Sequence, residues 1–242
     1  MAKAVERSSA RRTARSVSAN GTANEGSQRD RAYDEVRRRI LENELPAGTQ
    51  MLETEVAAML EMSRTPVREA LIQLANEGLV EIRPRHGMRV KALSPDDIAE
   101  IYDLLTCLEA TAAELAATRG LSSAEFAALD KTVVDMDKAL GRGDIREWAK
   151  VDQRFHDLLV VASGNKRLQD VVAALRDQAH RVRMATLMLR PMPTDSNEDH
   201  QAVIKAIRDR DAESARAIHH DHRKKSGAML VELLTRMGLS AL

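Results

Sequence analysis

Four side chains in the C-terminal half of the sequence are of types that bind divalent metal ions. Asp152 and His156 are four residues apart within one predicted helix, so their carboxylate and imidazole share a face and can converge on one ion. His200 and His222 lie on two later predicted helices, and a helical bundle can gather three helices around one interior point. The pattern is therefore compatible with a metal site. For Asp152 and His156 alone, a local hydrogen-bonded pair is the competing interpretation, and we expect the other nearby histidines to be surface or capping groups: His180, His219 and His220.

A second group of residues could read DNA. Arg64 and Arg68 are four apart, on the helix face opposite an apolar stripe that contains Val67 and Leu71. Arginines near a helix N-terminus can reach guanine edges or phosphates. A predicted hairpin downstream adds a basic cluster whose glycine suits close approach to DNA, and we prefer DNA reading to an ordinary solvated surface. The hairpin residues are Arg83, Arg85, His86, Gly87, Arg89 and Lys91.

The elements that carry these arginines form a winged helix-turn-helix in residues 29–92. Helical periodicity starts at Arg29, and two further helices are predicted at about 53–60 and from about residue 63 to Gly78. Two strands around the basic turn complete the wing. Residues 1–28 have no apolar periodicity, and we expect a disordered basic tail there.

The metal-type residues lie in a second domain, residues 94–237, which is predicted to be entirely helical. Ser94-Pro95-Asp96-Asp97 combines a cap, a proline in the first turn and acidic residues at the positive end of the helix dipole. The expected fold is mainly α, with the winged helix-turn-helix followed by a bundle of about six helices. These are predicted at about 95–118, 123–140, 144–163, 167–190, 197–209 and 212–237.

Composition limits the remaining classes of protein. The 242 residues contain 37 basic and 37 acidic side chains, so net charge alone does not indicate a nucleic-acid binder. The single cysteine excludes an internal disulfide framework, and no apolar run has the length of a membrane span. We therefore expect a cytoplasmic, nucleoid-associated protein. Only five aromatic residues are present, which argues against stacking on single strands and favours duplex reading.

The N-terminal segment resembles the DNA-binding domain of GntR-family transcription regulators over about residues 29–92. The resemblance rests on the run from Val56 to Leu71, which includes Ser-Arg-Thr-Pro-Val-Arg-Glu-Ala-Leu, and on Leu74 to Val80. Many relatives have a further DNA-contacting arginine where this sequence has Thr54, so its operator sequence is expected to differ. The resemblance implies operator contacts from Arg64, Thr65, Arg68, Arg85, His86 and Gly87.

Residues 94–237 resemble the FCD effector domain of the FadR subfamily, and the helix count is similar to the VanR-like group. The matching segments are 101–109, 152–156, 162–165, 200–207 and 211–215, with a histidine eleven residues after Asp211. The resemblance implies a divalent metal (zinc, nickel, iron or manganese) and a carboxylate effector. It implies the metal ligands Asp152, His156, His200 and His222.

Effector contacts are expected from Tyr102, Asn165, Arg154 and Arg183. The family usually carries an arginine where this sequence has Leu105, so a less cationic pocket is expected unless Arg154, Arg181 or Arg183 compensates.

The resulting hypothesis is a homodimeric transcription repressor, without enzymatic activity, that binds a near-palindromic duplex operator and responds to a small organic acid at the metal site. One alternative is a metal-dependent hydrolase, since a His/Asp site with an open position can activate water. The other is a metal-free regulator that responds to acyl-CoA.

Overall fold

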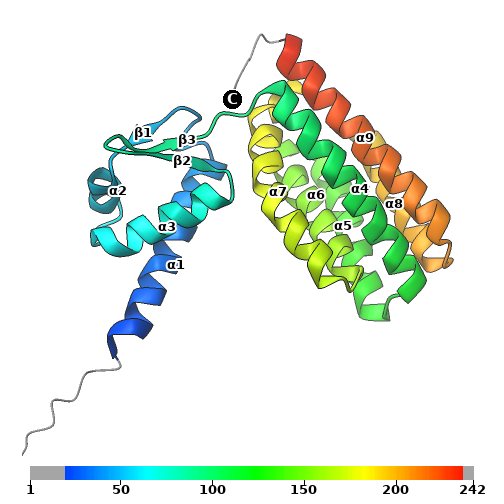
Figure 1. Cartoon of the computed structure of the whole chain (residues 1–242). Helices are drawn as coiled ribbons and strands as arrows, with labels where there is room; N and C mark the ends of the chain where they lie inside the picture. The colour runs from blue at the N-terminus through cyan, green and yellow to red at the C-terminus, as the bar shows by residue number, and fades with distance from the viewer. Residues whose placement is uncertain (1–19, 237–242) are drawn as a thin grey trace, which may run out of the picture.

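The computed structural model describes the backbone of residues 20–236 and the side chains of residues 28–236. It confirms the mainly α fold, with a small winged domain followed by a helical bundle (Figure 1). The expected tail lies outside the described residues up to position 19. Helix α1 (Asn20–Leu41) begins before the predicted start at Arg29. Once a helix is nucleated, each added residue contributes one backbone hydrogen bond, so it can extend into a segment without apolar periodicity.

Three helices form the core of the winged domain. Helices α1, α2 (Glu53–Met59) and α3 (Arg64–Asn76) bury one continuous apolar cluster. Ser63 and Gly78 flank α3 as the sequence predicts, and Gly78 adopts the left-handed φ of +75° that favours glycine. The buried face of α3 holds its apolar side chains, so its other face is free for an external partner. That buried face comprises Pro66, Val67, Ala70, Leu71 and Leu74.

The wing contains three strands, one more than the sequence predicts. Strands β2 (Val80–Arg83) and β3 (Gly87–Val90) form the expected antiparallel hairpin. The additional strand β1 (Gln50–Met51) pairs with β3, which gives the order β1-β3-β2. Two residues are too few to show strand periodicity in a sequence, so β1 is defined by its pairing with β3.

Six α-helices form the bundle, as predicted. Helix α4 packs against α6, α7, α8 and α9, and its many buried alanines permit close approach of these neighbours. Helix α7 ends earlier than expected and is followed by a short 3₁₀ turn, η1 (Leu187–Leu189). The bundle helices are α4 (Pro95–Arg119), α5 (Ser123–Gly141), α6 (Ile145–Ala162), α7 (Lys166–Ala185), α8 (Thr194–Arg208) and α9 (Ala212–Arg236).

Helix α7 is the part of the bundle that contacts the winged domain. Asp177 accepts two hydrogen bonds from the Arg37 guanidinium on α1. Gln178 donates to the Glu77 carbonyl at 3.2 Å, and Arg181 donates to the Lys91 carbonyl at 2.8 Å. One helix therefore carries all three of these polar links between the domains.

Within the described residues, no helix is both long and apolar enough to cross a membrane.

Candidate functional site

The structure brings the two predicted DNA-reading arginines together on the exposed face of α3. The side chains of Arg64 and Arg68 are 68% and 69% exposed, and Thr65 is also exposed. Glu53 on α2 lies 3.6 Å from the nearest guanidinium nitrogen of Arg64 and 3.9 Å from that of Arg68. These contacts are long and solvated, so they hold the arginines loosely and leave them available to a polyanion.

The tip of the wing combines exposed basic residues with a glycine that has a structural role. Arg85 and His86 are exposed, and Arg85 adopts a φ of +67°. A Cβ at Gly87 would lie 2.1 Å from the Met51 carbonyl oxygen, so strand β1 permits only glycine at this position. Packing of the backbone against β1 therefore explains why residue 87 is a glycine, independently of any approach to DNA.

In the bundle, the predicted metal ligands from three helices converge. One ring nitrogen from each of His156, His200 and His222 lies within 4.8 Å of the others. Asp152 Oδ1 lies 3.6 Å from Nε2 of both His156 and His200. Helices α6, α8 and α9 thus supply one carboxylate and three imidazoles around a common point, and all four residues are buried.

Two further carboxylates orient the imidazoles. Glu109 Oε2 lies 2.9 Å from His156 Nδ1, and Asp199 Oδ2 lies 3.3 Å from His222 Nδ1. Asp199 hydrogen-bonds to His222 Nδ1, whereas the contact of Glu109 with His156 Nδ1 has an ion-pair distance without hydrogen-bond geometry. Both contacts place a carboxylate at Nδ1 and leave Nε2 free to face the shared interior. A carboxylate at the second ring nitrogen fixes the tautomer and increases the basicity of a metal-ligating histidine.

The environment of His200 indicates that this set of donor atoms fits a divalent cation. Both of its ring nitrogens are buried and have no hydrogen-bond partner within the described residues. Burial lowers the pKa of His200 well below its usual range, so the ring is neutral and offers a lone pair. Leaving such atoms without partners is costly, whereas a cation within the cluster would satisfy one of them.

Sequence reasoning missed a buried network behind these histidines. Glu109 on α4 lies 3.1 Å from His219 Nε2 and 3.2 Å from Arg223 Nη2. His219 is fully buried, so its expected surface position is wrong. Burial alone would raise the pKa of Glu109, but Arg223 and His156 hold it well below its usual range. The spacing of His219 and His222, three residues apart on one helix, was the available sequence signal.

Glu109, His156 and His219 also form a second group whose ligand atoms lie within 4.8 Å of one another. Burial lowers the pKa of His219 to about 3, which leaves it neutral. Glu109 is already paired with Arg223, however, so it serves as the counter-charge of an arginine and as the orienting carboxylate of His156.

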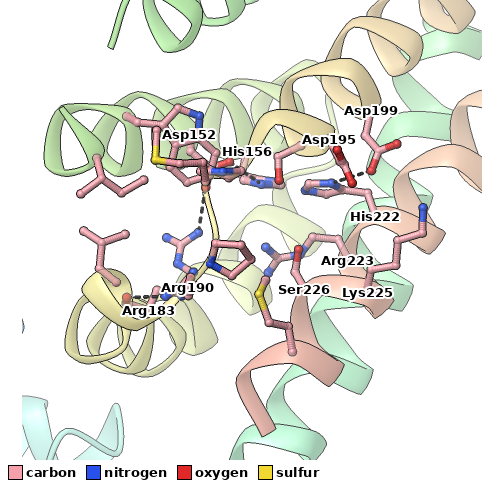
Figure 2. Close-up of a pocket in the computed structure, with 18 of the residues that line it drawn as sticks. Asp152, His156, Arg183, Arg190, Asp195, Asp199, His222, Arg223, Lys225 and Ser226 are labelled. Atoms are coloured by element: carbon pink, nitrogen blue, oxygen red, sulfur yellow. Dashed lines mark hydrogen bonds and ion pairs between the residues drawn. The ribbon is translucent and has the colours of Figure 1, made fainter. Parts of the chain in front are cut away.

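A cavity of about 240 Å³ opens beside the histidines (Figure 2). Two of the expected effector residues line it: Tyr102, and Arg183, whose Nη1 lies 3.3 Å from Asp152 Oδ2. The other two do not. Arg154 is exposed and points away from the buried face of α6, and Asn165 caps α7 by accepting from the Leu168 amide.

The cavity is more cationic than the sequence predicts. Leu105 is buried and apolar, but Arg190 and Arg223 line the cavity together with Arg183. Arg181, which we considered as a substitute, contacts the winged domain instead. The added arginines come from segments distant in sequence, and only the fold brings them to one place.

Exposed arginines on a helix-turn-helix, joined to a helical bundle with a polar cavity, are typical of a DNA-binding transcription regulator. Residues 28–90 match the family described as "Bacterial regulatory proteins, gntR family", and residues 100–225 match the FCD domain. The chain belongs to the GntR family of transcription regulators and carries an FCD domain.

Known relatives agree with this assignment. A "Probable D-xylose utilization operon transcriptional repressor" of Paenarthrobacter nicotinovorans is 32% identical over 73% of this chain and 76% of its own length. An "Uncharacterized HTH-type transcriptional regulator in the TAR-I ttuE-ttuC' intergenic region" of Agrobacterium vitis is 44% identical over 54% of this chain and 78% of its own. The "HTH-type transcriptional repressor RspR" of Escherichia coli is 26% identical over 78% of this chain and 83% of its own length.

Solved structures share the fold. Escherichia coli McbR/YncC has a TM-score of 0.73 at 20% identity and covers 85% of this chain and 98% of its own. A putative GntR regulator from Rhodococcus has a TM-score of 0.68 at 18% identity, with the same coverage. At these identities the likeness concerns the fold alone.

Proposed function

We propose that this regulator is a repressor whose DNA binding is controlled by a small carboxylate bound beside a divalent metal ion in the bundle. The observation that carries the proposal is the convergence of Asp152, His156, His200 and His222, with two unpaired ring nitrogens on His200. The names of two relatives, RspR and the D-xylose operon regulator, support repression.

Asp152, His156, His200 and His222 would hold the ion. The donor set suits zinc, nickel, iron or manganese, and the bound ion would supply a Lewis-acidic position for a carboxylate oxygen. Arg183 neutralises Asp152 from the cavity side, and Asp199 and Glu109 keep the Nε2 atoms of His222 and His156 directed inward. We assign the cluster to ligand sensing and not to catalysis, because it is joined to a DNA-reading domain.

On the DNA side, Arg64, Thr65 and Arg68 would enter the major groove while Arg85 and His86 contact the flanking backbone or minor groove. A homodimer would place two such domains on a near-palindromic duplex. Gly87 would shape the wing through its packing against β1.

Helix α7 supplies a route between the two sites. Its middle contacts the winged domain through Asp177, Gln178 and Arg181, and its last turn carries Arg183 at the cavity. A ligand that favours one position of α7 over another would therefore bias the arrangement of the DNA-binding domains.

A metal analysis followed by a thermal-shift screen tests the proposal. Full-length protein purified anaerobically should contain, or regain on addition of zinc, about one equivalent of metal per chain. A specific organic acid should then raise the melting temperature in a concentration-dependent way, because a ligand of the native state stabilises it by mass action. Protein that neither retains nor regains metal would contradict the metal site, and a screen without any stabilising acid would contradict the effector class.

A further inference from the structure

The cavity beside the histidines has a second polar end. Arg190, from the segment between η1 and α8, lines the cavity together with Tyr102 on α4 and Arg223 on α9. Figure 2 shows Arg183 and Arg190 close together on one side of the view, while His222 and Asp199 lie on the other. Asp152 lies 3.6 Å from two of the histidines and pairs with Arg183, and within the described residues no ion pair joins it to Arg190.

Arg190 is a largely buried cation without a carboxylate partner within residues 28–236. Its guanidinium donates to Thr186 Oγ1 from Nε at 3.2 Å and from Nη2 at 2.9 Å, and Nη2 also donates to the Arg183 carbonyl. These neutral acceptors fix the orientation of the guanidinium and leave Nη1 unused. Burial lowers the pKa of Arg190 to about 10, because the charged group loses water and its hydrogen-bond acceptors are neutral.

Two other donors at this end are buried and unpaired within the described residues. The Tyr102 hydroxyl and the Arg223 Nε have no hydrogen-bond partner, and both residues are less than 5% exposed. Helix α9 accommodates the Tyr102 ring at Gly227, where a Cβ would lie 2.8 Å from it. Buried donors normally have acceptors, so two unpaired buried donors on the wall of one cavity indicate that an acceptor from outside the chain binds there, and Arg190 Nη1 is a third donor without an assigned hydrogen bond.

The ion pairs around the cavity point the same way. Its half-buried and buried carboxylates contact groups other than Arg190: Asp152 contacts Arg183, Asp199 contacts His222 and, behind the cavity, Glu109 contacts Arg223. A divalent ion at the histidines would add positive charge to the cavity. A ligand with one negative charge, held at the histidine end, would leave Arg190 without a counter-ion.

We infer that Arg190, Tyr102 and Arg223 form a second anion subsite and that the effector is a small dicarboxylate, with one carboxylate at each end of the cavity. This inference rests on the proposed function, since the first carboxylate is the one expected beside the histidines. Trp148, Leu187 and Met229 line the cavity with apolar surface, which suits a short hydrocarbon chain between the carboxylates.

Isothermal titration of the full-length, zinc-loaded protein tests the subsite. The probes are malonate, succinate, glutarate and adipate, each paired with the monocarboxylate of the same chain length. At least one dicarboxylate should bind the wild type roughly tenfold more tightly than its paired monocarboxylate, because it gains charge-assisted hydrogen bonds. Arg190→Gln should remove this preference and leave monocarboxylate affinity within about threefold.

Two variants make the test robust. Tyr102→Phe removes only a hydroxyl that has no hydrogen-bond partner among residues 28–236, so it should keep the fold and still weaken dicarboxylate binding several-fold. Arg154→Gln changes an exposed arginine outside the cavity and should leave all affinities unchanged.

Equal affinity for both members of every pair, with Arg190→Gln and Tyr102→Phe like the wild type, would overturn the subsite while the proposed function stands. If no carboxylate binds at all, the proposed function fails and the subsite with it.

Discussion

The winged domain and the bundle use the same charged residue types in opposite environments. Arg64 and Arg68 are about two-thirds exposed and have only long contacts with Glu53. Arg223 and Glu109 are each about 4% exposed and paired at 3.2 Å. An exposed arginine costs the fold little and is free to meet a partner, whereas a buried one needs a counter-charge close to it. We propose that charge serves recognition of an external polyanion in the first domain and formation of an internal site in the second.

The largest effect is expected from breaking the buried pair. Glu109→Gln leaves the Arg223 charge uncompensated in the bundle, which should lower the free energy of unfolding by about 3–5 kcal/mol in urea denaturation. The matched control is Glu114→Gln, on the same helix α4 as Glu109. It removes an exposed ion-pair partner of Arg216 and should lower the free energy of unfolding by less than about 1 kcal/mol. Replacing Arg223 by methionine as well should recover part of the loss. Equal costs for the two single variants would show that burial does not distinguish the domains.

A change at the histidine cluster should affect metal binding. His200→Ala removes a fully buried ligand and should reduce zinc affinity by at least about 100-fold in competition with a chelator. Asp199→Asn, which removes only the orienting carboxylate of His222, should cost roughly 10–100-fold. His220→Ala is the control, since within residues 28–236 the hydrogen bond of its side chain is to the neighbouring Asp221. Wild-type affinity in His200→Ala would remove this residue from the site.

A change on α3 should affect DNA binding and little else. Arg68→Ala should weaken binding to the specific site by roughly 1–3 kcal/mol if the arginine reads a base. Its free energy of unfolding should change by no more than about 0.5 kcal/mol, because the side chain is exposed. A gel-shift titration and urea denaturation measure the two quantities, with Arg154→Ala as the control for loss of an exposed arginine. A stable variant with unchanged operator affinity would exclude Arg68 as a reading residue.

The smallest effect is expected where the two regions meet. Asp177→Asn removes the charge that pairs with Arg37 and should cost about 1 kcal/mol of stability, because Arg37 is 27% exposed and the asparagine oxygen can still accept a hydrogen bond from it. The ligand-induced change in DNA affinity should fall by about 1 kcal/mol, a factor of roughly 5. Asp157→Asn, which breaks a pair between α6 and α7 only, is the control. If both variants retain full coupling, α7 does not link the sites through this pair.

The sequence predicts those parts of the molecule that local patterns determine. Ser94 and Asp97 form the capping box expected at the start of α4, and the apolar stripe of α3 sets which face is buried. The helical spacing of Asp152 and His156 also predicts half of the cluster. In contrast, Glu109 meets His219 only because α4 and α9 pack together, 110 residues apart in sequence. Arg190 faces the cavity because α7 ends early, and no periodicity indicates that end.

The dependence of DNA binding on the bundle site is the central claim, and one measurement tests it most directly. The probe is a fluorescent duplex that the protein selects from a random-sequence library. Its affinity is measured by anisotropy with and without the tightest-binding dicarboxylate, for zinc-loaded wild type and His200→Ala. We predict that the ligand weakens wild-type DNA binding roughly 5- to 150-fold, whereas His200→Ala binds the duplex normally and does not respond. A ligand that binds the wild type without changing its DNA affinity would contradict the account.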